Sequence, residues 1–282
     1  MKNRKKMTGR KLAANILIWA VLILLSLLVL VPFVYMLLLS LLKDNSSLRL
    51  SFEKLANSTW TMENYTKVLR VNNFSRYILN SCIASFYAVA VACTVGAMAG
   101  YAFAKKKFPG STKMYMVYLI TMMIPSQVSL IPTYIICKNL GLLNTYTVLA
   151  VPAVSAFGTI LMHSFIKAVP DELLDSAQMD GCSEFGKFTK IVVPLIRPAL
   201  LSLAIFTFIE VWSMLLWPLL TTSSNDMMTV TMAVTLLKSN KAVTNYGFIM
   251  AGTTLAFLPP FILYLILQRQ FVEGIALSGI KS

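Results

Sequence analysis

The sequence predicts an all-α, polytopic membrane protein with six transmembrane helices and a cytoplasmic loop of short helices. Hydrophobic residues make up 57% of the 282-residue chain and charged residues 13%, and the mean hydropathy is +0.72. These values lie outside the range of soluble globular domains. Six apolar segments are each long enough to cross a bilayer. One polar stretch, residues 169–198, separates the fourth from the fifth.

The charge and the cysteines argue against nucleic-acid binding and metal binding. The net charge is +14, but the Lys and Arg residues gather at the ends of apolar segments and form no single basic face or tract. That distribution is typical of membrane topology. The four cysteines have no metal-ligand spacing, and we expect small buried side chains without a disulfide or a metal ion: Cys82, Cys93, Cys137 and Cys182.

The first apolar segment, from Leu12 to Leu42, follows the basic sequence KNRKK and superficially resembles a signal peptide. It holds 31 uncharged residues and ends at Lys43-Asp44, whereas a signal peptide has an apolar core of about 7 to 15 residues and a small-residue cleavage site. We expect this segment to remain as a membrane anchor. Because about 20 residues span a bilayer, it must tilt or protrude.

Five further apolar segments can each cross as a helix. They run over residues 77–104, 114–137, 146–166, 195–220 and 247–267. Prolines within or near the six spans predict kinks: Pro32, Pro125, Pro132, Pro152, Pro218, Pro259 and Pro260.

The second span carries a small residue at every fourth position: Ala84, Ala88, Ala92, Gly96, Gly100 and Ala104. Small residues let helix backbones approach closely in lipid. The row drifts by about 40° per step around a helix, so only its middle part can face one neighbour. It indicates either ordinary tight packing, which we favour, or a crossing on which helix bundles rock.

The distribution of basic residues predicts the orientation. With the N-terminus in the cytoplasm, the inside segments are 1–11, 105–113, 167–194 and 268–282, and with Arg197 they hold 16 of the 25 Lys and Arg residues. By the positive-inside rule both termini and the polar stretch are cytoplasmic. The chain then divides into an N-terminal part with the first span (1–76), a five-helix core with the loop 169–194 (77–267) and a cytoplasmic tail (268–282).

The polar stretch predicts two short helices that meet at a glycine. Pro170 followed by two acids suits a helix start, because proline needs no amide donor there and acids favour the positive end of the helix dipole. Gly181 supplies a stop. Ser183 can cap a second helix, which places apolar side chains at helical spacing: Phe185, Phe188 and Val192.

The same stretch resembles a known motif. Asp175-Ser176-Ala177, then Gly181, then nine residues, then Ile191-Val192-Val193-Pro194 is similar to the E-A-A-x3-G-x9-I-x-L-P loop of ABC importer permeases. Asp175, Ser176 and Val193 stand where the pattern has Glu, Ala and Leu.

Short sequences along the chain extend the resemblance to the smaller permease of maltose-type carbohydrate importers. They are Glu63-Asn64-Tyr65, Asn80-Ser81, Gly100-Tyr101-Ala102-Phe103-Ala104, LGLLNT over residues 140–145 and the tail LQRQFVEGIALSGIKS. One departure is Trp212-Ser213-Met214-Leu215, where family members often read W-N-(D/E)-F.

The resemblance implies a multi-subunit importer in the cytoplasmic (inner) membrane of a prokaryote. Its other members would be a second homologous permease, two ATPase subunits and an extracytoplasmic sugar-binding protein, and lipid would surround the spans. The loop 221–246 would approach the binding protein. We expect no cofactor in this subunit, since ATP and Mg²⁺ would be bound by the partner ATPase.

Two groups of residues would contact the ATPase. The coupling residues lie in the 169–194 loop: Leu173, Leu174, Asp175, Ala177, Asp180, Gly181, Phe185 and Pro194. The resemblance also implies that the tail, roughly residues 274–282 with Gly279 and Lys281, reaches into the ATPase dimer.

Glu210 is the only acidic residue inside a predicted span. A charge at that depth is costly, so it should face the bundle interior, water or a partner. Either it lines the pathway, with Trp212 beside it, or contacts a second permease, or it is a structural hydrogen-bonding group whose carboxyl could be protonated. Trp217 could stack on a sugar ring, but tryptophan is also common at membrane interfaces.

The sequence contains no Walker A motif, no paired carboxylates in one site and no nucleophile with a nearby histidine, so no enzyme activity is predicted. The expected function is a permease subunit that forms half of a transmembrane pathway for an oligosaccharide or related sugar. The alternatives are an ABC permease for a glycerol-phosphate-like substrate and an ATPase-independent secondary transporter, which would normally need more ionisable groups than Glu210.

Overall fold

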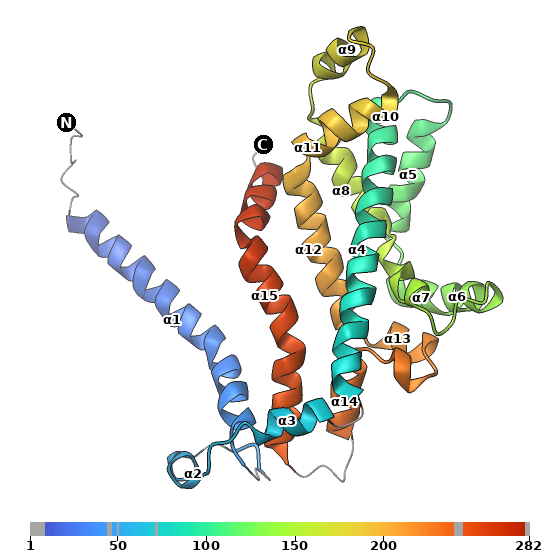
Figure 1. The fold of residues 1–282 in the computed structure, drawn as a ribbon. Helices are drawn as coiled ribbons and strands as arrows, with labels where there is room; N and C mark the ends of the chain where they lie inside the picture. Colours follow the sequence, from blue (N-terminus) through green and yellow to red (C-terminus); the bar gives the residue numbers. More distant parts are fainter. Residues whose placement is uncertain (1–8, 44–46, 50, 71–72, 240–244, 280–282) are drawn as a thin grey trace. The chain divides into compact units, whose positions relative to one another are not determined.

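The computed structural model describes residues 9–43, 47–49, 51–70, 73–239 and 245–279 (Figure 1). Within these ranges the regular elements are helices and the β structure is one isolated bridge between Leu42 and Trp60, which confirms the all-α class. The elements are α1 (Gly9–Ser40), α2 (Phe52–Asn57), α3 (Glu63–Arg70), α4 (Phe74–Lys105), α5 (Ser111–Thr121), α6 (Ser126–Asn139), α7 (Tyr146–Ala150), η2 (Val151–Ala153), α8 (Ala156–Lys167), α9 (Asp171–Met179), α10 (Glu184–Lys187), η3 (Phe188–Val192), α11 (Val193–Leu195), α12 (Arg197–Ser213), α13 (Leu216–Thr221), η4 (Asn225–Met227), α14 (Val230–Ser239) and α15 (Tyr246–Gly279).

Three helices of the described chain are long and apolar enough to cross a membrane: α1 over Ala14–Ser40, α4, and α15 over Tyr246–Gln268. Three further candidates are helix pairs joined at a bend: α5 with α6 at 108°, residues 146–153 with α8 at 53°, and residues 184–195 with α12 at 78°. The predicted number of six agrees with the structure if each bent pair is one span.

The predicted third span is sharply broken and is not one helix. Between α5 and α6 the chain turns at Pro125, whose ψ is 133°. Proline cannot donate a backbone hydrogen bond, and it pushes the residue before it out of the helical region. Pro152 lies in η2, at the 53° bend before α8.

The predicted fifth span, 195–220, also differs from the structure. Helix α12 ends at Ser213, Met214 is extended, and α13 restarts at Leu216. Pro218 explains the restart: as the third residue of α13 it needs no helical donor, whereas inside a continuous helix it would remove a hydrogen bond and clash with the carbonyl of residue 214.

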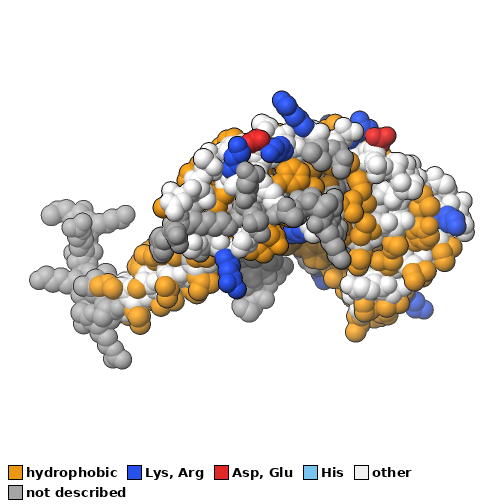
Figure 2. Space-filling model, turned by 90° about the horizontal axis from the view of Figure 1, so that it is seen from below, with side chains coloured by type: hydrophobic (Ala, Val, Ile, Leu, Met, Phe, Trp, Pro, Cys, Tyr) orange, Lys and Arg blue, Asp and Glu red, His pale blue; other side chains and the backbone are white. Residues whose placement is uncertain are grey.

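The chain forms two compact units, and the first comprises residues 1–68 and 240–255. The side-chain amide of Asn64 donates to the carbonyl oxygens of Ser40 and Leu42, both at 2.9 Å. A Cβ on Gly247 would lie 2.6 Å from the Leu42 carbonyl oxygen. These contacts join α1, α3 and the start of α15. Along α1 the side chains from residue 14 to residue 34 are exposed, and all but Asn15 and Ser26 are hydrophobic (Figure 2).

The second unit comprises residues 69–239 and 256–282 and is built around α4. Helix α4 packs against α8 and α12 (Figure 1). A Cβ on Gly96 would lie 3.2 Å from the Gly158 carbonyl carbon, and one on Gly100 would lie 2.7 Å from Met162 Cβ. The middle of the small-residue series is therefore a close helix crossing, which both interpretations require.

The small-residue row also changes neighbours, as its drift predicts. Ala84, Ala88 and Ala92 belong to a hydrophobic cluster with α7. Gly96 and Gly100 instead lie against α8, and Ala104 packs against a second cluster that includes residues of α8 and α12. The boundaries predicted at residues 76 and 267 follow membrane topology and differ from those of the compact units; that division stays a prediction.

Candidate functional site

Helix α9 has the start and the stop that the sequence predicts. Pro170 precedes its first residue, and Asp171 and Glu172 occupy the first turn. At its end Gly181 has a φ of +76°, and its N–H donates to the Gln178 carbonyl at 3.0 Å. Only glycine adopts this left-handed conformation routinely, so Gly181 allows the chain to reverse into α10.

The second short helix is capped by Ser183. The Ser183 Oγ accepts a hydrogen bond from the Gly186 N–H at 3.2 Å, as expected for a helix N-terminus. Helix α10 then continues through the π-turn η3 and α11 into the bend before α12. Together α9 to α11 form a structured segment, residues 169–194, at one end of the second unit (Figure 1).

The predicted coupling residues divide into exposed and buried groups. Leu173 is 45% exposed and Phe185 is 68% exposed, whereas Leu174 is only 7% exposed and belongs to the core cluster with α4 and α8. Ala177 is half-buried, and the remaining predicted residues are exposed: Asp175, Asp180, Gly181 and Pro194. Met179, which the sequence reasoning missed, is 87% exposed. The segment thus presents apolar side chains to solvent.

Ion pairs fasten the segment to the C-terminal end of α4. The Lys105 Nζ lies 2.6 Å from the Asp171 carboxylate and also donates to the Val169 carbonyl. The Glu184 carboxylate pairs with Lys106 and with Lys187, the latter at 2.8 Å, and it accepts a hydrogen bond from the Tyr101 hydroxyl at 3.2 Å. The sequence reasoning used Lys105 and Lys106 for topology alone.

These contacts lower the pKa values of two carboxyl groups. The hydrogen bond from Lys106 and then that from Lys187 lower the pKa of Glu184 from 4.5 to about 2. The hydrogen bond from Lys105 lowers the pKa of Asp171 below its usual value. Both carboxylates are therefore ionised and paired at neutral pH, which holds α9 and α10 against α4.

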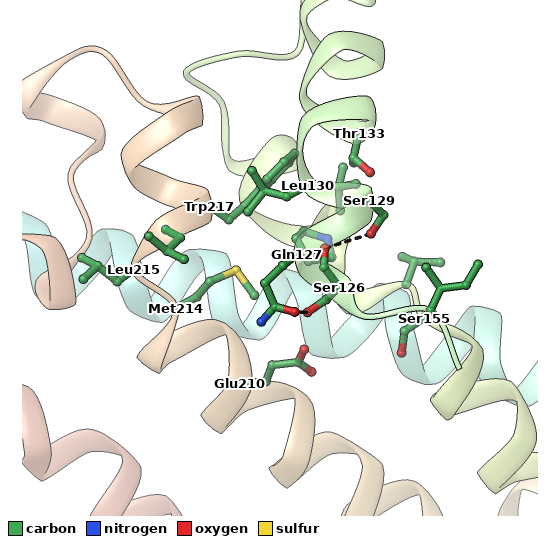
Figure 3. Close-up of a pocket in the computed structure, with 15 residues that line it drawn as sticks. Ser126, Gln127, Ser129, Leu130, Thr133, Ser155, Glu210, Met214, Leu215 and Trp217 are labelled. Carbon is green, nitrogen blue, oxygen red and sulfur yellow. Dashed lines mark hydrogen bonds between the residues drawn. The ribbon is translucent and has the colours of Figure 1, made fainter. Parts of the chain in front are cut away.

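A cavity of 600 Å³ lies in the membrane part of the second unit (Figure 3). The chain breaks described above form it: the start of α6 after Pro125, the bend at η2, and the junction of α12 with α13. Its polar side chains are Ser126, Gln127, Ser129, Thr133, Ser155 and Glu210, and the others are apolar, including Trp217.

The structure separates the two predicted pathway residues. Glu210 is exposed and lines the cavity. Trp212 is 5% exposed, stacks on Phe208 at 5.5 Å, and donates from Nε1 to the Ala256 carbonyl at 3.0 Å. It is not among the residues that line the cavity. Consecutive residues of a helix point about 100° apart, so Glu210 and Trp212, which are two positions apart on α12, face different sides of the helix.

Trp217 lines the cavity, and its Nε1 donates to the Val148 carbonyl at 2.7 Å. Its indole is thereby oriented, and the packing interpretation of this residue fits the geometry. Of the predicted tail contacts, Gly279 is the last residue of α15, and Lys281 lies outside the described residues.

Comparison with known proteins shows one family. Residues 92–276 match the family model described as "Binding-protein-dependent transport system inner membrane component". The chain is 32% identical over 226 residues to the arabinooligosaccharides transport system permease protein AraQ of Halalkalibacterium halodurans, which covers 79% of this chain and 81% of that protein.

Two other relatives differ in the substrate that they are named for. The lactose transport system permease protein LacG of Rhizobium radiobacter is 31% identical, over 97% of this chain and 99% of that protein. The sn-glycerol-3-phosphate transport system permease protein UgpE of Yersinia pestis is 34% identical, over 72% and 73%.

A solved structure has the same fold. A chain of a bacterial ABC transporter involved in the import of the acidic polysaccharide alginate superposes with a TM-score of 0.79 at 19% identity, covering 95% of this chain and 99% of that one.

Proposed function

The chain belongs to the family of binding-protein-dependent transport system inner membrane components, and from that premise we propose that it is the permease subunit of an ABC importer for a carbohydrate. It forms half of the transmembrane pathway and pairs with a second, homologous permease. An extracytoplasmic binding protein delivers the sugar, and two ATPase subunits supply the energy. ATP and Mg²⁺ bind to those partners, and this chain catalyses no reaction.

The observation that best supports the proposal is the exposed apolar surface of the 169–194 segment. Leu173, Met179 and Phe185 are exposed apolar side chains on a segment whose other exposed side chains are mostly polar. Such side chains are suited to insertion into a groove on a soluble partner. The lysine contacts of Asp171 and Glu184 join this surface to the end of α4.

The mechanism follows from that connection. A displacement of the ATPase moves the segment as a body, since capped helices and ion pairs resist deformation. Helix α4 packs tightly on α8 and α12 and receives that displacement. The cavity at the start of α6 and the end of α12 then opens alternately to one side of the membrane and to the other. Both termini lie in the cytoplasm in this arrangement.

The test is co-purification of the complete transporter through a tag on this chain. Gly181→Pro forces a φ near −65° where the chain needs +76°, so the ATPase should be lost from the purified complex while the permease stays in the membrane. Gly141→Pro is the matched control, because Gly141 also has a positive φ, +68°, but lies in the connection predicted outside. Recovery of ATPase with Gly181→Pro, or wild-type uptake without ATP, would contradict the proposal.

A second candidate substrate is a glycerol phosphate, because one of the relatives is named for it. The two candidates differ in charge at neutral pH. The charge of the groups that line the cavity therefore bears on which of them can pass.

A further inference from the structure

Among the described residues that line the membrane cavity, the one ionisable side chain is an acid. Of the fifteen described residues that line it, Glu210 is acidic and none is Lys, Arg or His. The remaining polar groups are the hydroxyls of three serines and a threonine and the amide of Gln127. Hydroxyls and amides both donate and accept hydrogen bonds, so they suit a hydroxyl-rich ligand.

Glu210 faces the part of the cavity lined by the polar residues Ser126 and Gln127. It lies one turn before the end of α12, and its carboxylate points toward the side on which Ser126 and Gln127 lie (Figure 3). These two are the first residues of α6 after the break at Pro125. The Ser126 Oγ donates to Gln127 Oε1 at 3.4 Å, and the Ser129 Oγ donates to the Ser126 carbonyl at 3.0 Å. In the described part of the chain, no lysine or arginine forms an ion pair with Glu210.

An unpaired carboxylate in a membrane cavity acts strongly on a charged ligand. Coulomb interactions there are weakly screened compared with those in bulk water, so an anion close to Glu210 is repelled. A neutral polyol meets no such repulsion and can donate hydroxyl hydrogens to the carboxylate, which makes charge-assisted hydrogen bonds. A lysine or arginine able to bind a phosphate or a uronic acid is missing from the lining residues.

We propose that Glu210 selects the transported compound by charge: the cavity passes an uncharged, hydroxyl-rich saccharide and excludes acidic sugars and phosphate esters. This inference rests on the proposed function and narrows it. Gln127 and Ser126 bind hydroxyls of the ligand opposite the carboxylate. Glu210 thereby becomes a specificity-determining residue, and the glycerol-phosphate alternative is rejected.

The experiment measures relative uptake of two matched probes by the reconstituted transporter with its binding protein and ATP. The probes are arabinotriose and the aldonic acid made by oxidising its reducing end, which adds one carboxylate and leaves the other residues intact. In wild type the acid should enter at least tenfold more slowly than the neutral sugar. In Glu210→Gln the ratio of acidic to neutral uptake should rise at least tenfold. Because the binding protein is the same in both, the change reports the permease.

Three variants control the result. Glu210→Asp keeps the charge and should keep the wild-type ratio. Glu63→Gln removes an exposed carboxylate from the first unit and should also keep it. Gln127→Lys adds a cation to the cavity while leaving Glu210 in place, and it should raise the ratio; it tests the charge argument even if Glu210→Gln fails to assemble.

Different results would contradict the charge selection and the importer function. An uptake ratio that is unchanged in both Glu210→Gln and Gln127→Lys would overturn the charge selection and leave the importer intact. Wild-type import of sn-glycerol 3-phosphate at a rate equal to or above that of arabinotriose would do the same. Absence of ATP-dependent import of arabinotriose, of its aldonic acid and of sn-glycerol 3-phosphate would overturn the carbohydrate importer itself, and the selection with it.

Discussion

At the scale of single residues, Glu184 is one of the links between the 169–194 segment and α4. Its carboxylate contacts Lys106, Lys187 and Tyr101, and its pKa is lowered to about 2. A group whose pKa is lower in the folded state stabilises that state above its unfolded pKa and loses this effect as the pH falls through the folded value. The contribution of Glu184 is therefore complete above about pH 4.5 and decreases toward about pH 2.

We predict that acid releases the segment from α4 within that window. Spin labels at Lys107 and Asp180, both exposed side chains, should give a narrow distance distribution at pH 6 in nanodiscs. The distribution should broaden as the pH falls from about 4.5 toward about 2. Glu184→Gln should give the broad distribution at every pH. A distribution that stays narrow across this range would show that Glu184 does not hold the segment in place.

The residues of the site were predictable to different degrees. Glu210 could be singled out because a lone acid within an apolar span is conspicuous. The separation of Trp212 from Glu210 depends on which neighbours each face of α12 meets, and the Ala256 carbonyl that accepts from Trp212 is 44 residues away in the chain. Likewise, Lys105 and Lys106 look like topology signals until α9 and α10 supply their acids.

At the scale of elements, the exposed apolar face of the 169–194 segment leads to a binding prediction. Phe185→Ala and Leu173→Ala should each weaken binding of the partner ATPase by about 1–2 kcal/mol, because truncating an apolar anchor at the centre of an interface has this typical cost. The affinity is measured with the purified permease pair and added ATPase. Uptake should fall accordingly.

Two matched leucines make that prediction specific. Leu79 is 50% exposed on α4, outside the segment, so Leu79→Ala should leave ATPase binding unchanged. Leu174 is 7% exposed, and Leu174→Ala should lower the thermal stability of the permease, since it leaves a cavity in the core. Equal losses of affinity for Leu79→Ala and Phe185→Ala would place the ATPase elsewhere.

Local signals predicted elements well where they act within a few residues. The start of α9 at Asp171, its end before Gly181 and the Ser183 cap all follow from capping chemistry. The bend of 108° between α5 and α6 did not follow. Pro125 predicts a break in the helix, but the angle between α5 and α6 depends on which residues pack against the two helices. The sequences of α5 and α6 do not specify those contacts.

At the scale of the whole molecule, the surface is suited to contact with lipid and with partner subunits. Most side chains of α1 are exposed and hydrophobic, and those of α5 and α6 are largely exposed as well. In water such faces would aggregate. In a bilayer they would contact lipid or, in the proposed importer, the second permease, whose half of the pathway would close the exposed side of the cavity.

The orientation of this assembly is the remaining prediction. In a variant with its four native cysteines replaced, single cysteines would be placed at Pro109, Asn57 and Ser223, which are exposed side chains. The positive-inside rule places Pro109 in the cytoplasm, because its loop carries four lysines and no acid. A membrane-impermeant maleimide added to intact cells should label positions 57 and 223, and it should label position 109 only after permeabilisation. Labelling of position 109 in intact cells would show that the topology is the reverse of the predicted one. The 169–194 segment would then lie outside the cell, where no ATP is available, and both the orientation and the ATPase contact would be refuted.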